Sequence, residues 1–110
     1  MRYAFALSLC LAAAVAQAGT ERCLLQVDGR AYIKGPCATL RQDNGSLMVG
    51  SDGNRISSPY FAQITPNEDG SADGFWNEIP KSTHAQSSLG TLKRSGTCWI
   101  NARATVCAER

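Results

Sequence analysis

The chain has little excess of charge of either sign. Its 110 residues include 11 Lys and Arg and 9 Asp and Glu, which gives a formal net charge of +2. Apart from Lys93-Arg94, the cations are isolated in the sequence. Nucleic-acid binding depends on a basic block or stripe, and attraction to anionic membrane surfaces depends on a basic cluster. The charge pattern therefore predicts neither a nucleic acid nor a membrane surface as a partner.

Residues on which catalysis and metal binding depend are scarce. The chain has one histidine, His84, and the spacings C-x-x-C and H-E-x-x-H do not occur. A catalytic triad needs a histidine that is placed beside a nucleophile, and no serine or cysteine nucleophile motif accompanies His84. We therefore expect a protein that is not an enzyme, with no catalytic residue, no metal site and no cofactor. His84 is expected in a loop.

A long apolar run occurs once, at the N-terminus. Met1-Arg2 supplies a positive charge, residues 4–15 are almost wholly apolar, and Ala16-Gln17-Ala18 has the small-x-small pattern of a cleavage site. This arrangement predicts a secretory signal peptide over residues 1–18, with cleavage between Ala18 and Gly19. The run is shorter than the roughly 20 residues of a spanning helix. We expect an exported protein, periplasmic or secreted, whose residues 19–110 form one domain without a membrane span.

Export has a consequence for the cysteines. Cys10 lies in the predicted signal peptide, which leaves Cys23, Cys37, Cys98 and Cys107. Four cysteines in a small exported domain predict two disulfides, for which three pairings exist. The local pairing, Cys23 with Cys37 and Cys98 with Cys107, is slightly favoured. The alternative joins both ends of the domain, pairing Cys23 with Cys107 and Cys37 with Cys98.

Short apolar stretches alternate with turn residues along the rest of the chain, and no stretch has sustained helical periodicity. This pattern is typical of a small all-β domain. It predicts an antiparallel barrel or sandwich of about six to eight short strands. Helix is limited to one short turn, near 38–40 or 82–87. The expected strands are 23–27, 30–34, 47–50, 60–65, 71–77, 89–93, 98–100 and 104–108.

The first hairpin is predicted from its turn. Asp28-Gly29 favours a type I′ turn that pairs Val27 with Arg30. Continuing this register places Leu25 opposite Tyr32. Gly35-Pro36 is expected to end the second strand.

The last hairpin carries the other two cysteines. A loop over residues 101–104 pairs Ile100 with Thr105, and Cys98 then faces Cys107 within disulfide range.

Four residues are candidates for contact with a partner: Trp76, Trp99, Asn101 and Arg103. If either tryptophan is exposed, it would anchor an interface beside a cation. The Arg103 guanidinium suits a carboxylate on a partner. A disulfide between Cys98 and Cys107 would make the last hairpin rigid and hold Arg103 in place. The alternatives are a core position for the tryptophans and a turn-capping role for Asn101 and Arg103.

Two stretches, Cys23–Cys37 and much of residues 84–108, resemble small exported, disulfide-containing bacterial proteins of uncharacterised function. This resemblance implies no activity. The chain has a looser similarity to periplasmic inhibitors of c-type lysozyme, which are small disulfide-tied β-barrels that insert a loop into the enzyme. Those inhibitors carry a Ser-Gly-x-x-Tyr segment, whereas Ser95-Gly96 is followed here by Thr97-Cys98-Trp99. No inhibitory residue is therefore assigned.

These observations predict a non-enzymatic binding module, periplasmic or secreted, with a protein partner. One alternative is an inhibitor of a hydrolase such as c-type lysozyme, and another is an exported effector that acts on a host protein. A cleft with His84 beside a carboxylate would favour an enzyme. A protruding rigid loop would favour an inhibitor, and a flat aromatic patch would favour a partner surface.

Overall fold

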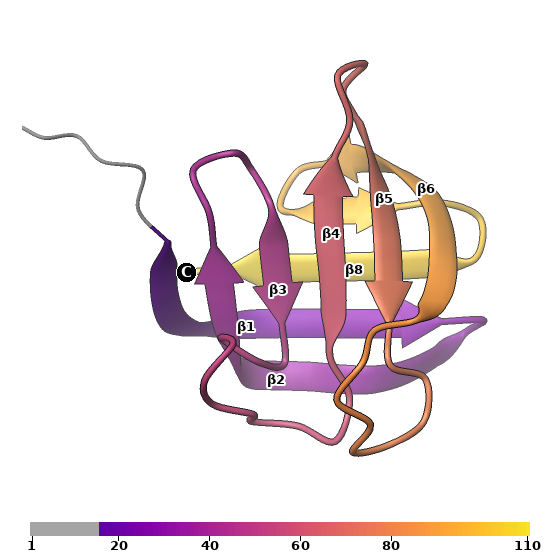
Figure 1. The fold of residues 1–110 in the computed structure, drawn as a ribbon. Coiled ribbons are helices and arrows are strands. Elements are labelled where there is room, and N and C mark those ends of the chain that lie inside the picture. Colours follow the sequence, from indigo (N-terminus) through magenta and orange to yellow (C-terminus); the bar gives the residue numbers. More distant parts are fainter. Residues whose placement is uncertain (1–15) are drawn as a thin grey trace, which may run out of the picture.

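The computed structural model describes residues 16–110, which contain strands and loops but no helix (Figure 1). The strands are β1 (Gln17–Val27), β2 (Arg30–Arg41), β3 (Leu47–Val49), β4 (Ala62–Pro66), β5 (Ser71–Trp76), β6 (Ser87–Ser95), β7 (Cys98–Ile100) and β8 (Ala104–Glu109). Each strand pairs antiparallel with the next, and β8 pairs with β1, so the sheet closes into a barrel. The all-β prediction is confirmed. The expected helical turns are wrong, because 38–40 belongs to β2 and 82–87 has no helical residue.

Most of the predicted signal peptide lies outside the described residues. Gln17 and Ala18, its last two residues, begin β1 and pair with Arg41 and Leu40. Within residues 16–110 no helix is long and apolar enough to cross a membrane.

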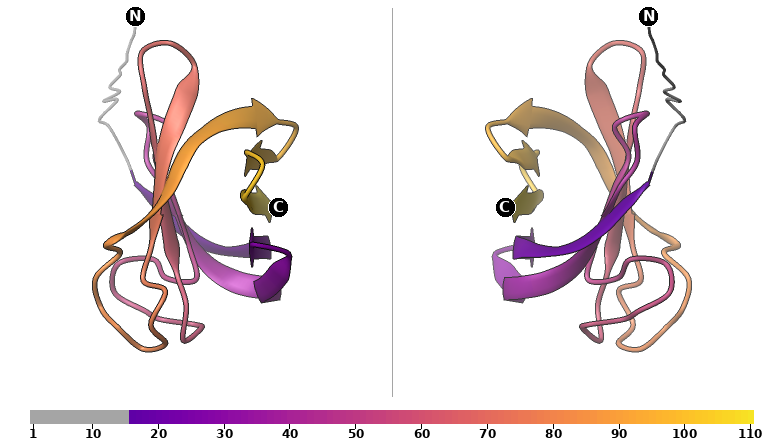
Figure 2. Two further views of the ribbon diagram at one scale, coloured as in Figure 1. Left: turned by 90° about the vertical axis from the view of Figure 1, so that its right-hand side faces the viewer. Right: turned by 90° about the vertical axis from the view of Figure 1, so that its left-hand side faces the viewer.

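The barrel is flattened into two layers whose strands cross. In Figure 1, β3, β4 and β5 run at a steep angle to β8 and to the long parts of β1 and β2. Figure 2 shows β6 and the β1–β2 hairpin curving from one layer into the other. Orthogonal packing of this kind needs strands that bend at the corners.

The bend of β2 corrects one prediction. Gly35-Pro36 was expected to end the strand, but β2 continues to Arg41. Gly35 has a φ of 123°, which glycine adopts without the steric cost of a Cβ. Pro36 lies opposite Arg22 with its ring exposed, so the strand loses one N–H donor and not its pairing. The two residues therefore form a corner of the barrel.

The first hairpin has the predicted turn. Asp28 and Gly29 have positive φ values of 53° and 84°, and Val27 pairs with Arg30. A type I′ turn requires both values to be positive, which is why Asp-Gly specifies it.

Beyond this turn the register differs from the prediction. The pairing shifts between Leu25 and Gln26, so Leu25 faces Ile33 and not Tyr32. A β-bulge with Tyr32 as the extra residue accounts for the shift. The sequence does not predict this bulge. Apolar residues occupy both faces of the hairpin, so the alternation of apolar and polar residues does not fix the register.

The strands alternate between inward and outward side chains, and the inward set fills the barrel. The largest fully buried side chains are Leu25, Val49, Ile64, Leu89, Leu92 and Val106. Gly74 also faces inward. A Cβ there would lie 2.6 Å from Leu92 Cδ1, so the interior has no room for a side chain at this position.

Both disulfides follow the local pairing. Cys23 is bonded to Cys37 across β1 and β2, and Cys98 is bonded to Cys107 across β7 and β8. Cys98 and Cys107 are direct partners in the register, as the hairpin argument predicted. Paired cysteines are typical of an oxidising compartment outside the cytoplasm.

An ion pair that the sequence analysis did not anticipate lies at the start of β1. Glu21 points into the barrel and accepts hydrogen bonds from Arg41 Nε at 2.9 Å and Arg41 Nη2 at 2.8 Å. Thr39 Oγ1 donates to the same carboxylate at 2.9 Å. Arg41 Nη2 also donates to the carbonyl of Ala108. The pair therefore joins β1, β2 and β8 at the end of the barrel where the chain terminates.

Candidate functional site

Two long loops leave the same end of the β3–β5 layer. Residues 50–61 connect β3 to β4, and residues 77–86 connect β5 to β6. In Figure 1 both loops extend beyond the strands at the bottom of the view. We refer to them as the paired loops.

Asn77 holds the paired loops together. Its side chain is buried, and its Oδ1 accepts a hydrogen bond from the N–H of Phe61 at 3.0 Å. Its Nδ2 donates to the carbonyls of Pro59, Ile79 and Ser82, at 2.9, 3.2 and 3.1 Å. One amide thus fixes the backbone of both loops, and its buried polar atoms are satisfied.

The first loop is also ordered by its own side chains. Asp52 Oδ1 accepts hydrogen bonds from the N–H groups of Asn54 at 2.9 Å and Arg55 at 2.6 Å. These two bonds, together with the nearby Arg55 guanidinium, hold the pKa of Asp52 below its usual range. Ser57 Oγ accepts from the N–H of Ala38 at 2.8 Å and so attaches the loop to β2.

The second loop contains unusual backbone conformations. Glu78 and Lys81 have φ values of 56° and 71°, in the left-handed region that non-glycine residues seldom adopt. Hydrogen bonds hold both positions: Ser87 Oγ donates to Glu78 Oε1 at 2.6 Å, and the N–H of Lys81 donates to the carbonyl of Pro59 at 2.8 Å. Backbone strain of this kind clusters at functional sites.

The paired loops carry the two most exposed large aliphatic side chains among the described residues. Ile56 is 61% exposed and Ile79 is 68% exposed. A cavity of about 270 Å³ lies next to Ile56, lined by Ile56, Ser57, Ser58, Pro59 and Lys81. Lys81 forms no ion pair within residues 16–110, whereas Arg55 is paired with Asp52. The loops therefore present apolar side chains and one available cation on a fixed backbone.

The structure does not place the predicted tryptophans on the surface. Trp76 is 2% exposed and contacts Tyr32 and Tyr60, with ring centroids 4.7 and 6.0 Å away. Trp99 is 8% exposed and lies beneath the Arg94 guanidinium, 5.4 Å from its ring centroid. Both belong to the core, so neither is an exposed anchor for a partner.

Asn101 has the structural role that was its alternative interpretation. Its Oδ1 accepts from the N–H groups of Arg103 and Ala104, at 2.8 and 2.7 Å, and caps the β7–β8 turn. Its Nδ2 donates to the carbonyls of Leu89 and Thr91, at 2.8 and 3.1 Å. β7 ends at Ile100, so the Asn101 side chain supplies the donors to β6 that a longer β7 would have provided.

We expect Asn101→Asp to lower the free energy of unfolding by about 1–3 kcal/mol. The substitution keeps an oxygen for the turn but removes both donors to β6 and places a carboxylate against two carbonyls. Urea unfolding followed by circular dichroism would measure the loss. Asn54→Asp, on an exposed turn, is the matched control and should change stability by less than about 0.5 kcal/mol. Equal losses in the two variants would contradict the bridging role.

Arg103 is exposed, but its guanidinium already contacts residues of its own chain. Its Nε lies 3.2 Å from Asp28 Oδ1, and its Nη1 donates to the carbonyl of Ser88 at 2.8 Å. The N–H of Asp28 in turn donates to the carbonyl of Arg103. Arg103 therefore links the first hairpin, β6 and the β7–β8 turn, and its guanidinium is already paired with a carboxylate of its own chain.

His84 lies exposed on the second loop, as predicted. Its backbone N–H faces Ser82 Oγ at 3.4 Å, and within residues 16–110 its imidazole forms no ion pair with a carboxylate. The described part of the chain contains no cluster of three or more His, Cys, Asp or Glu residues arranged to hold a metal ion. Among residues 16–110, no carboxylate forms the ion pair that would orient this histidine for proton transfer.

Comparison with known proteins gives no match to a family model, to a curated protein or to a solved structure.

The sequence analysis identified both paired loops as irregular segments but did not identify them as the candidate site. Both loops fall in gaps between the expected strands, at 51–59 and at 78–88. Isolated isoleucines in such segments are a weak signal of an exposed apolar surface, since most large aliphatic residues are buried. Asn77 carries no distinctive motif, because its role depends on contacts with Pro59 and Phe61.

Proposed function

We propose that this protein is an exported, non-enzymatic protein-binding module whose contact surface is the paired loops. The exposure of Ile56 and Ile79 on backbone fixed by Asn77 is the observation that carries the proposal. A folded protein gains nothing for its own stability from aliphatic side chains held in water. An ordered loop loses less conformational entropy on binding than a flexible one, so such a surface suits a partner.

The chemistry of the loops narrows the type of partner. The cavity beside Ile56 has the size for one apolar side chain, and Lys81 at its edge suits a neighbouring carboxylate. The contact surface would therefore fit a protein that presents an apolar residue next to an acidic one. The two disulfides and the N-terminal apolar run support a site of action in the periplasm or outside the cell.

The test is site-specific crosslinking followed by substitution. The oxidised domain, residues 19–110, carries a photo-crosslinking amino acid at position 79, or at position 100 as the control. It is exposed to periplasmic extract and to host secretions. A partner crosslinked from position 79 but not from position 100 would support the proposal. Ile79→Asp and Ile56→Asp should then weaken the purified complex by roughly tenfold or more, as expected for interface hot spots.

Two controls make the result decisive. Ile100→Asp alters an aliphatic residue that is exposed on β7 and should leave the affinity unchanged. Circular dichroism would confirm that each variant is folded. Wild-type affinity in both loop variants would contradict the proposal. Loss of function in His84→Ala, with the loop variants unaffected, would favour an enzyme.

Inhibition of a hydrolase is the second candidate function. The paired loops project beyond the strands on an ordered backbone, which is the geometry of a loop that enters an active-site cleft (Figure 1). A c-type lysozyme assay with equimolar oxidised domain distinguishes this case from binding without inhibition. Inhibition that Ile79→Asp relieves would establish it, and full lysozyme activity at saturating domain would contradict it for that enzyme.

A further inference from the structure

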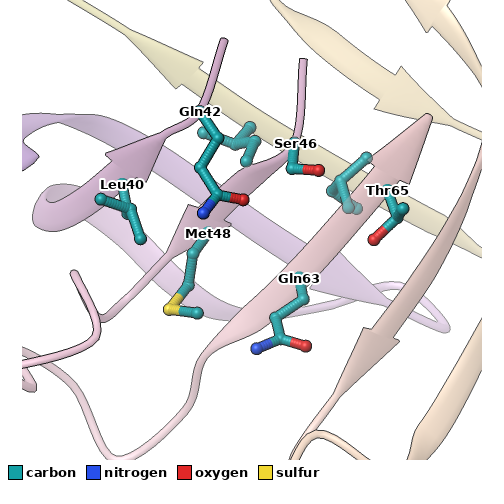
Figure 3. Close-up of a pocket in the computed structure, with 8 residues that line it drawn as sticks. Leu40, Gln42, Ser46, Met48, Gln63 and Thr65 are labelled. Carbon is teal, nitrogen blue, oxygen red and sulfur yellow. The ribbon is translucent and has the colours of Figure 1, made fainter. Parts of the chain in front are cut away.

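A second surface lies on the outer face of the barrel, on the strands of the β3–β5 layer. The β2–β4 groove is a hollow of about 240 Å³ between the end of β2 and strands β3 and β4. Its lining is Leu40, Gln42, Ser46, Leu47, Met48, Gln63, Ile64 and Thr65. None of these residues carries a charge. Figure 3 shows the Met48, Gln63 and Thr65 side chains projecting from β3 and β4, with Leu40 and Gln42 from the β2 side.

Strand pairing arranges the outward side chains of this layer in two rows. In the first row Leu40 pairs with Met48, Met48 with Gln63, and Gln63 with Phe75. Neighbouring strands are about 4.8 Å apart, so this row from β2 to β5 extends for about 14 Å. Phe75 is 39% exposed, although it is a large aromatic residue. The row is apolar apart from one amide.

The second row is polar. Thr65 pairs with Asp73, and Asp73 pairs with Thr91 on β6. Gln42 and Ser46 lie at the β2–β3 turn, where the N–H of Gln42 donates to the carbonyl of Ser46 at 3.0 Å. Amide and hydroxyl groups dominate this row. Each of them both donates and accepts hydrogen bonds, which suits a ligand whose own groups do the same.

The surface therefore combines an apolar row with a parallel row of amide and hydroxyl groups and one carboxylate, that of Asp73. Beneath the groove, the end of β2 and strands β3 and β4 are paired on both sides, so a peptide cannot join the sheet there through its backbone. The residues that line the groove carry no charge, and the one carboxylate of the second row, Asp73, can accept hydrogen bonds from sugar hydroxyls. A sugar ring has an apolar face of C–H groups and a rim of hydroxyls that donate and accept, which matches both rows.

We infer that the β2–β4 groove and the adjacent Phe75 form a binding site for an uncharged oligosaccharide. The sugar rings lie across the strands on Leu40, Met48 and Phe75. Gln42, Gln63 and Thr65 bond the hydroxyl groups. This site lies on the strands and is separate from the paired loops, so it does not depend on the proposed protein-binding function.

The experiment is an NMR titration of the oxidised domain with chitohexaose, cellohexaose, xylohexaose and maltohexaose. The expected result is binding of at least one of them, with shifts centred on residues 40–48, 63–65 and 75. Phe75→Ala should weaken that binding by about tenfold, because it removes the aromatic face. The Gln63 side-chain amide resonances should also shift. Ile100→Ala, a substitution of similar exposure on β7, should leave the affinity unchanged.

Three results would overturn the inference. One is the absence of binding by all four oligosaccharides at 10 mM, roughly the weakest affinity that a specific site would have. Another is an equal loss of affinity in Phe75→Ala and Ile100→Ala. The third is binding of an uncharged peptide to this face without binding of any oligosaccharide, which would indicate a protein partner. Ile79→Asp, tested in parallel, should bind the oligosaccharide normally, so the outcome is independent of the paired loops.

Discussion

Glu21→Gln is expected to lower the free energy of unfolding by about 3 kcal/mol, within the usual range for breaking a buried ion pair. The carboxylate is buried and accepts two hydrogen bonds from Arg41 and one from Thr39. The glutamine keeps the shape but leaves the Arg41 cation without a counter-charge. The Arg41 side chain is about one-third exposed, so water can solvate the cation after its counter-charge is removed. We therefore expect a loss of stability near the lower end of the range.

The measurement is urea unfolding of the oxidised domain at pH 7. Glu109→Gln serves as the matched control, because Glu109 forms a well-exposed ion pair with Arg22 at 3.4 Å. Exposed pairs contribute about 0–1 kcal/mol, so this variant should unfold almost like the wild type. Similar losses in the two variants would show that the buried Glu21–Arg41 pair contributes no more to stability than the exposed Arg22–Glu109 pair.

The same pair sets a dependence on pH. Hydrogen bonds from Arg41, and then from Thr39, lower the pKa of Glu21 from its ordinary value of 4.5, against the opposing effect of burial. A lowered pKa in the folded state means that the contribution of Glu21 is complete above the unfolded pKa and is lost as the pH falls through the folded one. The gap in stability between wild type and Glu21→Gln should therefore narrow as the pH falls below 4.5. A gap that stays constant would contradict the assignment.

Local chemistry made much of the fold predictable. The type I′ turn at Asp28-Gly29 and the four-residue connection at the last hairpin are both specified by a few neighbouring residues. The second of these slightly favoured the Cys98–Cys107 disulfide, since cross-strand partners are close enough to bond.

Features that depend on the closed barrel were not predictable in the same way. The bend at Gly35-Pro36 is a strand corner only because two layers must be connected there; locally, the same dipeptide is a sound signal for the end of a strand. Glu21 was not assigned to the core, because its burial requires Arg41 from another strand. The burial of Trp76 and Trp99 likewise depends on packing across the barrel, and Asn101 acquired its role because β7 ends after three residues.

The candidate site shows the same division between local and long-range information. The sequence left both loops as gaps between expected strands, but their pairing depends on Asn77, whose side chain bonds Phe61 16 positions away. The two rows of the outer face depend on strand register, which sequence alone specifies poorly for strands as short as β3. Function in small barrels is carried by such long-range arrangements, so the fold class alone gives no activity.

Removal of the disulfides is the second large effect that we expect, and the two bonds should differ. The residues they join are 14 and 9 positions apart, so the chain-entropy contributions are about equal, at roughly 2–4 kcal/mol each. Cys23 and Cys37 are in addition buried in the core, whereas Cys98 and Cys107 are half-buried on the outer face of β7 and β8. The double variant Cys23→Ala/Cys37→Ala should lose about 1 kcal/mol more than Cys98→Ala/Cys107→Ala, because it leaves a void in the interior.

The Cys98→Ala/Cys107→Ala variant should instead show a local effect. β7 has three residues, and this disulfide is the covalent link that reinforces its pairing to β8. We expect amide hydrogen exchange to accelerate in 98–100 and in the facing part of β8, while β3 to β5 keep their protection. Urea unfolding and hydrogen exchange on the two variants separate these effects. A larger global loss from the Cys98–Cys107 bond, or uniform acceleration of exchange along the chain, would show that this bond stabilises the whole barrel and not the β7–β8 hairpin.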